Sequence, residues 1–261
     1  MIRYSDYLPL HNYEKNPGGH LLEFSLGKLA YVTSALPLGS FLFCVIWSLV
    51  YNFEEATFTH CKVPNYLPSV SAAIGNYTLQ RIVFTSAIVL HTGPRIIYLL
   101  AYQEYYREVL KRRSLYLAQI AALLNIIEIV SLLALTLVPS AVNYPIHEKC
   151  FITFILTSEV YMIVTCWIYK KERQLPFNNL ESRSFNLKLK CFVLNIFCFS
   201  IAGYCFLRHN AYCEPGVYTM FALFEYVVVI TNILFHFTIV YDINGKMSSV
   251  LISKNCSVQF R

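Results

Sequence analysis

The fold is decided by apolar stretches such as residues 41–50, which read FLFCVIWSLV and carry no charged side chain. Residues 226–230, YVVVI, have the same character. About 20 apolar helical residues are needed to cross a bilayer. The hydropathy of the chain shows six apolar stretches of about that length. The expected spans are residues 28–51, 82–102, 115–138, 151–169, 189–207 and 217–241. The chain is therefore expected to form about six transmembrane helices.

Composition excludes an ordinary soluble domain. Apolar residues make up 56% of the chain and charged residues 14%, and the mean hydropathy is +0.49, whereas soluble domains carry about 25% charged residues. A transmembrane β-barrel would alternate polar and apolar residues, which these stretches do not. The expected class is an all-α membrane bundle without internal repeats or a heptad array. Lys188 and Lys190 crowd the start of the fifth span, so five spans remain an alternative.

The distribution of basic residues predicts the orientation. The connections after the second and fourth expected spans are basic, and such connections lie in the cytoplasm. Both termini then lie there too, as a cytoplasmic segment at 1–27 and a tail at 242–261, while the transmembrane domain at 28–241 has a long lumenal loop at 52–80. The net charge of +6 comes from these connections. It suits an anionic leaflet and gives no reason to expect nucleic acid as a partner.

Seven of the polar side chains inside the expected spans form a candidate buried cluster, and an ionisable group at a helix centre costs about 2.5 to 3.5 kcal/mol. They are His91, Arg95, Asn125, Glu128, Glu225, Asn232 and His236. Their spacing places the members of each helix on one face. By the expected topology, His91, Glu128 and Glu225 lie near the bilayer midplane, whereas Arg95 and His236 lie nearer the cytoplasm.

Two interpretations of these residues stay open. In one, they form a buried network that joins helices, with Arg95 paired to Glu128 or Glu225. In the other, they line a polar cavity in which His91 acts as a general base.

A second polar cluster is expected at the lumenal mouth of the bundle. It consists of His147 and Glu148 before the fourth span, and of Arg208, His209, Asn210 and Glu214 between the fifth and sixth spans. A guanidinium group binds phosphate through a planar fork, so Arg208 is a candidate lipid-phosphate ligand. The alternative is a flanking arginine that extends to the membrane surface. No known acyltransferase, serine hydrolase or zinc-hydrolase motif is present.

Three cysteines are expected on the oxidising side: Cys61, Cys150 and Cys213. A disulfide between Cys61 and Cys213 is the favoured pairing because it would fix the long first loop over the mouth, and three free thiols are the alternative. The lack of a CxxC pair argues against a metal site. The Asn76 sequon lies so near the second helix that its glycosylation is doubtful.

Several stretches resemble one family of membrane proteins, in sequence and in order. Residues 59–75 read THCKVPNYLPSVSAAIG in the expected first loop. Further matches read LHTGPR at 90–95, IHE at 146–148, RHNAYCE at 208–214, GVYT at 216–219, EY at 225–226 and TN at 231–232. Together they make residues 28–242 similar to the post-GPI-attachment-to-proteins factor 2 family. The chain departs from the family pattern at Lys62, where glycine is expected, and at Gly93, where alanine is expected.

The resemblance implies a role in lipid remodelling of GPI anchors, in Golgi membranes and also in those of the endoplasmic reticulum. A lyso-GPI protein would be reacylated there at the sn-2 position with a saturated, stearoyl chain. His147 or His209 would take the proton from the lipid hydroxyl as general base. Arg208, Asn210, Glu148 and Glu214 would contact the substrate at the mouth.

The same resemblance sets the expected ligands and partners. The acyl donor would be acyl-CoA or a phospholipid, and no tightly bound cofactor is expected. Lyso-GPI-anchored proteins, membrane lipid and other GPI-remodelling proteins are the expected partners. The alternative is a non-catalytic protein that presents the lipid or scaffolds a separate acyltransferase.

The orientation gives the first testable prediction. Protease added to sealed vesicles that expose their cytoplasmic face should remove a tag from either terminus, because both termini are expected on that face. Immunoblotting of the two tags is the measurement. A tag that survives digestion until detergent is added would contradict the orientation.

Overall fold

The computed structural model describes residues 20–75, 77–243, 249–253 and 258–260. Its long helices are α1 (Leu26–Tyr51), α4 (Thr78–Val109), α5 (Leu115–Leu137), α6 (Tyr144–Trp167), α7 (Asn179–Tyr212) and α8 (Val217–Phe237). Together with short helical turns at three of their ends, these give six helices long and apolar enough to cross a membrane. The predicted six-helix bundle is confirmed, and the five-span alternative is wrong.

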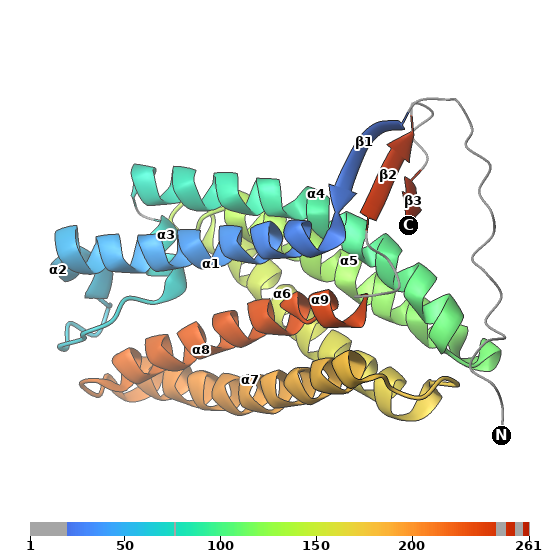
Figure 1. Cartoon of the computed structure of the whole chain (residues 1–261). Helices are drawn as coiled ribbons and strands as arrows, with labels where there is room; N and C mark the ends of the chain where they lie inside the picture. The colour runs from blue at the N-terminus through green and yellow to red at the C-terminus, as the bar shows by residue number, and fades with distance from the viewer. Residues whose placement is uncertain (1–19, 76, 244–248, 254–257, 261) are drawn as a thin grey trace, which may run out of the picture.

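Short elements occupy the two ends of the bundle (Figure 1). At one end lie α2 (Phe53–Thr57) and α3 (Val70–Gly75); at the other lie α9 (Ile239–Asp242) and the strands β1 (His20–Ser25), β2 (Ser249–Ser253) and β3 (Val258–Phe260). β1 and β3 both pair antiparallel with β2. The sequence did not predict this sheet. Because it joins segments near both termini, the two ends of the described chain meet at one end of the bundle.

The remaining short elements are a 3-10 turn at Arg112–Ser114 before α5 and a π-helical turn at Ile168–Glu172 after α6.

The predicted start of the fifth span is wrong, because a cap and not the apolar run fixes the end of this helix. The Asn178 side chain accepts a hydrogen bond from the Glu181 backbone N–H at 2.8 Å, and the Glu181 carboxylate accepts one from the Asn178 N–H at 3.0 Å. This reciprocal capping box satisfies N–H groups that a helix start leaves free. As a result α7 has 34 residues.

The fourth and fifth spans also extend beyond their predicted mouth-side ends. Asn143 caps α6 by accepting from the Ile146 N–H at 3.2 Å, so His147 and Glu148 lie in the first turns of α6. Residues 208–210 lie in the last turn of α7. The prediction placed both groups in connections, where their side chains would be less constrained.

Helix α7 buries small and polar side chains at alternating spacings of three and four residues. They are Glu181, Ser184, Lys188, Cys191, Asn195, Cys198, Ala202, Cys205 and His209. This burial repeats every seven residues, but it is not a heptad array of large apolar residues, which the sequence was expected to lack. Small residues let helices approach closely in a bilayer. Asn195 Nδ2 adds bonds across to α8, to the Val228 carbonyl at 2.9 Å and to Thr231 Oγ1 at 2.8 Å.

A buried ion pair closes the bundle near the sheet. Lys188 Nζ on α7 lies 2.5 Å from Asp242 Oδ2 on α9, and the two side chains are 1% and 0% exposed. Tyr102 also donates to Asp242 at 2.7 Å, and the Lys188 ammonium lies 4.9 Å from the ring centroid of Tyr169. The sequence interpretation counted Lys188 among exposed loop cations and did not predict this pair.

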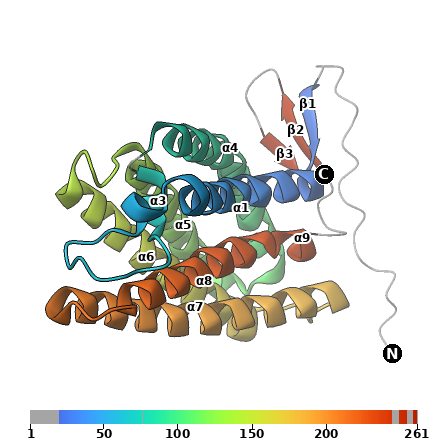
Figure 2. The same cartoon turned by 90° about the vertical axis from the view of Figure 1, so that its left-hand side faces the viewer.

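The first loop folds over the opposite end, which we call the mouth (residues 52–75, 77, 138–143 and 213–216; Figure 2). The Tyr66 N–H donates to Thr219 Oγ1 at 2.9 Å, and the Tyr226 hydroxyl donates to the Pro68 carbonyl at 2.5 Å. Cys61 and Cys213, the pair favoured from the sequence, are joined by a disulfide. Asn76 lies outside the described residues. The loop is thus docked on the bundle.

Lys62 in this loop has a φ of 55°. That left-handed conformation favours glycine, which has no Cβ. The family pattern expects a glycine at this position, and the backbone gives the physical reason.

The disulfide gives the second testable prediction. Non-reducing peptide mapping should recover Cys61 and Cys213 in one linked peptide, while Cys150 reacts with an alkylating agent, because only the first two sulfur atoms are bonded. Alkylation of Cys61 and Cys213 without reductant would contradict the pairing. Cys205, a free buried thiol on α7, serves as the reference for slow alkylation.

Candidate functional site

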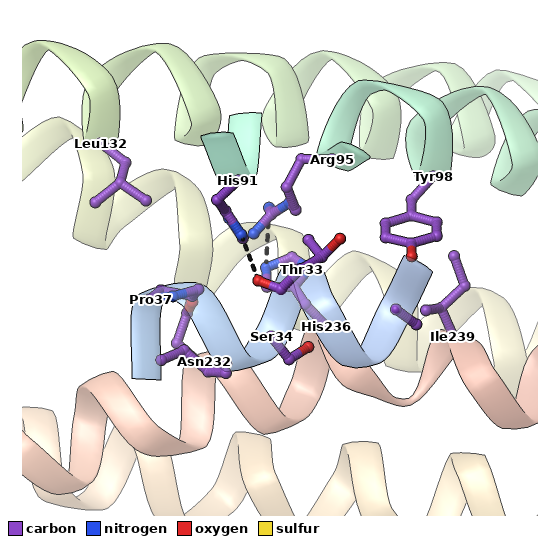
Figure 3. Close-up of a pocket in the computed structure, with 12 residues that line it drawn as sticks. Thr33, Ser34, Pro37, His91, Arg95, Tyr98, Leu132, Asn232, His236 and Ile239 are labelled. Atoms are coloured by element: carbon purple, nitrogen blue, oxygen red, sulfur yellow. Dashed lines mark hydrogen bonds between the residues drawn. The ribbon is translucent and has the colours of Figure 1, made fainter. Parts of the chain in front are cut away.

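Five of the seven polar residues predicted inside the spans form one network. The Glu128 carboxylate on α5 meets His236 Nε2 on α8 at 2.9 Å and Arg95 on α4 at 3.5 Å. Arg95 also donates to Asn125 Oδ1 at 3.1 Å and lies 3.2 Å from His236 Nε2 (Figure 3). Asn232 donates to Glu128 at 3.2 Å and to Ser158 at 2.6 Å, which adds α6.

This network resolves the predicted alternatives for Arg95, which pairs with Glu128. The prediction that Glu128 lies at a different depth from Arg95 and His236 is wrong, because their side chains meet at one level of the bundle. Glu225 is not a member. Its carboxylate accepts from the Val70 N–H at 2.9 Å and so holds α3 of the first loop.

A small cavity lies beside the network, between α1, α4, α5 and α8. His91, Arg95, Asn232 and His236 line it with Thr33 and Ser34 of α1 (Figure 3). Its volume is about 40 Å³, which suits a few water molecules and excludes a lipid chain. His91 donates through Nδ1 to the Thr33 carbonyl at 2.7 Å and therefore joins α4 to α1. The network and its cavity hold helices together and have no room for an acyl substrate.

His147 occupies a different setting at the mouth, where its two ring nitrogens have distinct partners. Nδ1 lies 2.8 Å from the Val138 carbonyl at the end of α5, and Nε2 lies 3.0 Å from Ser71 Oγ on α3. A carbonyl can only accept, so Nδ1 carries a proton, and in the neutral imidazole Nε2 is then the unprotonated nitrogen. The ring is 9% exposed. His147 is thus oriented as a base toward a hydroxyl group.

His209, the second predicted base, is buried on α7. Its Nε2 lies 3.2 Å from Thr59 Oγ1, and its ring packs against His60 and Tyr218 with centroids 5.7 and 5.1 Å away. Both predicted histidines therefore contact a hydroxyl residue of the first loop. The structure places both histidines at the mouth, where each contacts a different residue of the first loop.

Arg208 is exposed at the mouth and paired to Glu214. Its Nε and Nη2 donate to the two carboxylate oxygens at 2.5 and 2.8 Å, and Nη1 donates to the Tyr204 hydroxyl at 2.5 Å. The hydrogen bond from Arg208 holds the pKa of the Glu214 carboxyl below its usual range, so this carboxyl is charged near neutral pH. A phosphate ligand would have to share Arg208 with Glu214. Asn210 on α7 and Glu148 on α6 are exposed as well.

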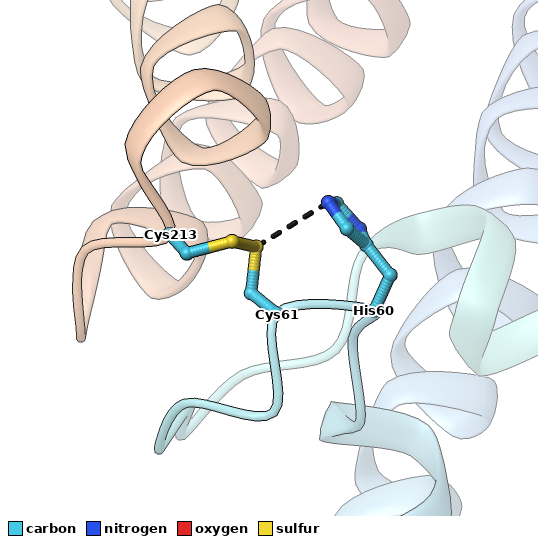
Figure 4. Close-up of side chains that lie close together, drawn as sticks. All are labelled: His60, Cys61 and Cys213. Carbon is cyan, nitrogen blue, oxygen red and sulfur yellow. Dashed lines mark hydrogen bonds between the residues drawn. A yellow bond between two sulfur atoms is a disulfide. The ribbon is translucent and has the colours of Figure 1, made fainter.

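The disulfide has a histidine neighbour. His60 Nε2 lies 3.3 Å from Cys61 Sγ (Figure 4). The three ligand atoms of His60, Cys61 and Cys213 lie within 4.8 Å of one another. The two sulfur atoms are bonded to each other, so they do not act as metal ligands in this state.

Sequence reasoning missed Ser71 and Thr59 as partners of the histidines. Both lie within the stretch at residues 59–75 that carries the family resemblance. Their hydroxyls gain a role only from contacts 76 and 150 residues away along the chain. The family resemblance pointed to this segment, but no sequence signal distinguished these two side chains within it.

The buried network gives the third testable prediction. Arg95→Ala should lower the free energy of unfolding by about 3 to 5 kcal/mol, because it leaves the buried Glu128 carboxylate without its arginine partner. Protein abundance and thermal unfolding in detergent are the measurements.

Two further variants sharpen that test. Arg107→Ala on the same helix removes an arginine that is 66% exposed and should change the unfolding free energy by at most about 1 kcal/mol. Adding Glu128→Gln to Arg95→Ala should recover part of the loss. An Arg95→Ala protein as stable as the parent would contradict the structural role.

Comparisons with known proteins agree with this architecture. Residues 25–246 match the Frag1/DRAM/Sfk1/Cwh43P N-terminal domain family. A Drosophila melanogaster protein named "Post-GPI attachment to proteins factor 2" is 44% identical over 235 residues, covering 90% of this chain and 92% of the relative. "Acyltransferase PGAP2" of Xenopus tropicalis is 44% identical over 228 residues, covering 87% and 90%. No solved structure matches. The chain therefore belongs to the post-GPI attachment to proteins factor 2 group of the Frag1/DRAM/Sfk1/Cwh43 family of multi-pass membrane proteins.

Proposed function

We propose that this chain is an acyltransferase that remodels GPI anchors by reacylating lyso-GPI proteins. The acyl group would enter at the sn-2 position and would be a saturated, stearoyl chain. One observation carries the proposal: His147 presents an unprotonated Nε2 to a hydroxyl at the mouth, in a chain similar to a protein named an acyltransferase. A base in this state can take the proton of a lipid hydroxyl during acyl transfer.

The position of His147 supports a phospholipid substrate. Exposed apolar and aromatic side chains surround the start of α6, including Val142, Tyr144 and Ile146. Tyrosines are enriched where the hydrocarbon region meets the headgroups. A glycerol hydroxyl lies at that level, so a lyso-lipid can bring it to His147 from within the membrane.

The headgroup would lie further out, on the exposed polar side chains of the mouth. In this scheme Arg208 contacts the phosphate through the N–H groups that Glu214 and Tyr204 leave free, because five donors are present and three are used. Asn210 and Glu148 would contact inositol hydroxyls. Lyso-GPI-anchored proteins are then the partners, the donor is acyl-CoA or a phospholipid, and no tightly bound cofactor takes part.

The compartment and the assembly are part of the same proposal. The protein would act in Golgi membranes, and in those of the endoplasmic reticulum, with the mouth facing the lumen where GPI anchors lie. Other GPI-remodelling proteins would supply the lyso-lipid that it consumes.

Reconstitution gives the fourth testable prediction. Purified protein in liposomes should transfer a labelled stearoyl group to a lyso-GPI protein, and His147→Ala should slow this transfer by about 10²- to 10⁴-fold, the usual contribution of a general base. Product lipid released by phospholipase treatment is measured by mass spectrometry. His209→Ala tests the second candidate base in the same assay.

A matched control distinguishes catalysis from folding. Glu54→Ala removes an exposed side chain of α2 at the same mouth and should transfer at the parent rate. If the parent protein transfers no acyl group, yet both it and His147→Ala restore surface GPI proteins to null cells, a non-catalytic lipid-presenting or scaffold role replaces the proposal. Transfer by His147→Ala at the parent rate would remove His147 as the base.

A further inference from the structure

Ser71 has the surroundings of an activated nucleophile. Its Oγ lies 3.0 Å from His147 Nε2, and the other ring nitrogen is fixed by the Val138 carbonyl at 2.8 Å. A hydroxyl, a base within hydrogen-bond reach and a third group that orients the base form the usual arrangement for nucleophilic catalysis. With Nδ1 protonated, Nε2 can only accept, so the Ser71 hydroxyl donates its proton toward the base.

Many serine and threonine hydroxyls on the described part of the spans have a backbone carbonyl as their partner, and not a base. Several donate to carbonyls one turn back in their own helices, as helical serine and threonine often do. Examples are Thr33, Thr92, Thr136, Thr153 and Ser200. Thr59 at the mouth contacts His209 but also accepts from Asn65 Nδ2 at 3.4 Å. Ser71 therefore differs from these hydroxyls in having an oriented base as its partner.

The segment that carries Ser71 is held on both sides. The Val70 N–H donates to Glu225 at 2.9 Å, and the Ala72 N–H donates to Ser69 Oγ at 3.2 Å. The Ser48 hydroxyl on α1 donates to the Ala73 carbonyl at 3.1 Å. A nucleophile fixed by its supporting contacts loses little entropy on reaching the reactive geometry. The buried Glu225, which is outside the intramembrane network, thus acts as a positioning residue for α3.

Access favours an acyl group as the reaction partner. Ser71 is half-buried, whereas its base is almost fully buried. The exposed rim of Val142, Tyr144 and Ile146, between 47% and 70% exposed, surrounds the helix that carries His147. This level of the membrane holds the ester carbonyls of phospholipids. A long-chain acyl ester or thioester can bring its carbonyl carbon to Ser71 there.

We infer that Ser71 accepts the acyl group from the donor and carries it as a covalent ester before the lyso-lipid receives it. This inference rests on the proposed acyl transfer and divides it into two displacements. In the first, Ser71 Oγ attacks the donor carbonyl while His147 Nε2 takes the hydroxyl proton. The bond from the carbonyl to the donor oxygen or sulfur breaks, and the leaving alcohol or thiol takes that proton from His147.

The second displacement regenerates the protein. The lyso-lipid hydroxyl attacks the carbonyl of acyl-Ser71, and His147 takes the hydroxyl proton. The bond from the carbonyl to Ser71 Oγ then breaks, and Ser71 receives the proton from His147. One ester or thioester is exchanged for one ester, so no oxidant or reductant takes part.

The fifth testable prediction is an acyl-enzyme formed without acceptor. Purified full-length protein in dioleoylphosphatidylcholine vesicles is incubated with stearoyl-CoA in one arm and distearoylphosphatidylcholine in the other, and intact mass is measured. One stearoyl group should appear on the parent protein with one of these donors, and peptide mapping should place it on Ser71. Adding lyso-GPI protein should discharge it.

Three variants make the assignment specific. Ser71→Ala should carry no acyl group and should slow overall transfer as strongly as His147→Ala, because nucleophile and base act as one unit. Ser71→Cys should hold the stearoyl group as a thioester that neutral hydroxylamine removes, which also shows that this variant is folded. Ser200→Ala, a lipid-facing serine on α7, should behave as the parent.

The outcomes separate this inference from the proposed function. If Ser71→Ala transfers stearate at the parent rate, the acyl group passes directly to the lyso-lipid, and the nucleophile is overturned while the acyltransferase stands. Acylation mapped to any other residue also overturns it. If the parent neither carries nor transfers an acyl group with either donor, both proposals fail together.

Discussion

The neutralisation of one buried carboxylate constrains the whole bundle. Glu128 is 1% exposed, and a lone charge at such a site would be strongly destabilising. Arg95 from α4 compensates this charge, His236 Nε2 from α8 lies 2.9 Å from the carboxylate, and Asn232 bridges it to Ser158 of α6. These bonds can form together only when each of the four helices has one particular rotation about its axis and one particular position along the bundle. That register also sets where the mouth ends of α5, α6 and α8 lie, and with them His147 and Glu225.

Much of the fold follows from the sequence, because the bilayer imposes a length and a polarity on each span. Hydropathy identified six helices. Arg95 and Glu128, which pair in the structure, are among the polar residues that are unusual in such apolar helices. Helix ends did not follow, since Asn178 and Asn143 decide them by capping. The terminal sheet and the Lys188–Asp242 pair did not follow either. Each depends on segments far apart in the chain, and nothing local distinguishes Lys188 from an exposed loop lysine.

The candidate site shows the same division between local and distant information. His147 and His209 stand out because histidines are few and lie beside other polar residues. Ser71 does not stand out, because a serine in a loop is common. Its significance comes from His147, 76 residues away, and from the Val138 carbonyl that fixes the ring. Glu225 was grouped with Asn232 and His236 by helical spacing, yet its partner is a backbone N–H of the first loop.

The disulfide has a consequence for how the protein is made. Cys61 and Cys213 are separated by 152 residues, and α4, α5, α6 and α7 lie between them. Cys61 is synthesised early, long before Cys213. It has to be a free thiol when the hairpin of α7 and α8, which carries Cys213, has been inserted. Cys150 is a free thiol that emerges in the meantime. Oxidation of the native pair can thus mark a chain whose insertion is complete, and a mismatched Cys61–Cys150 bond would mark one that a quality-control oxidoreductase has still to correct.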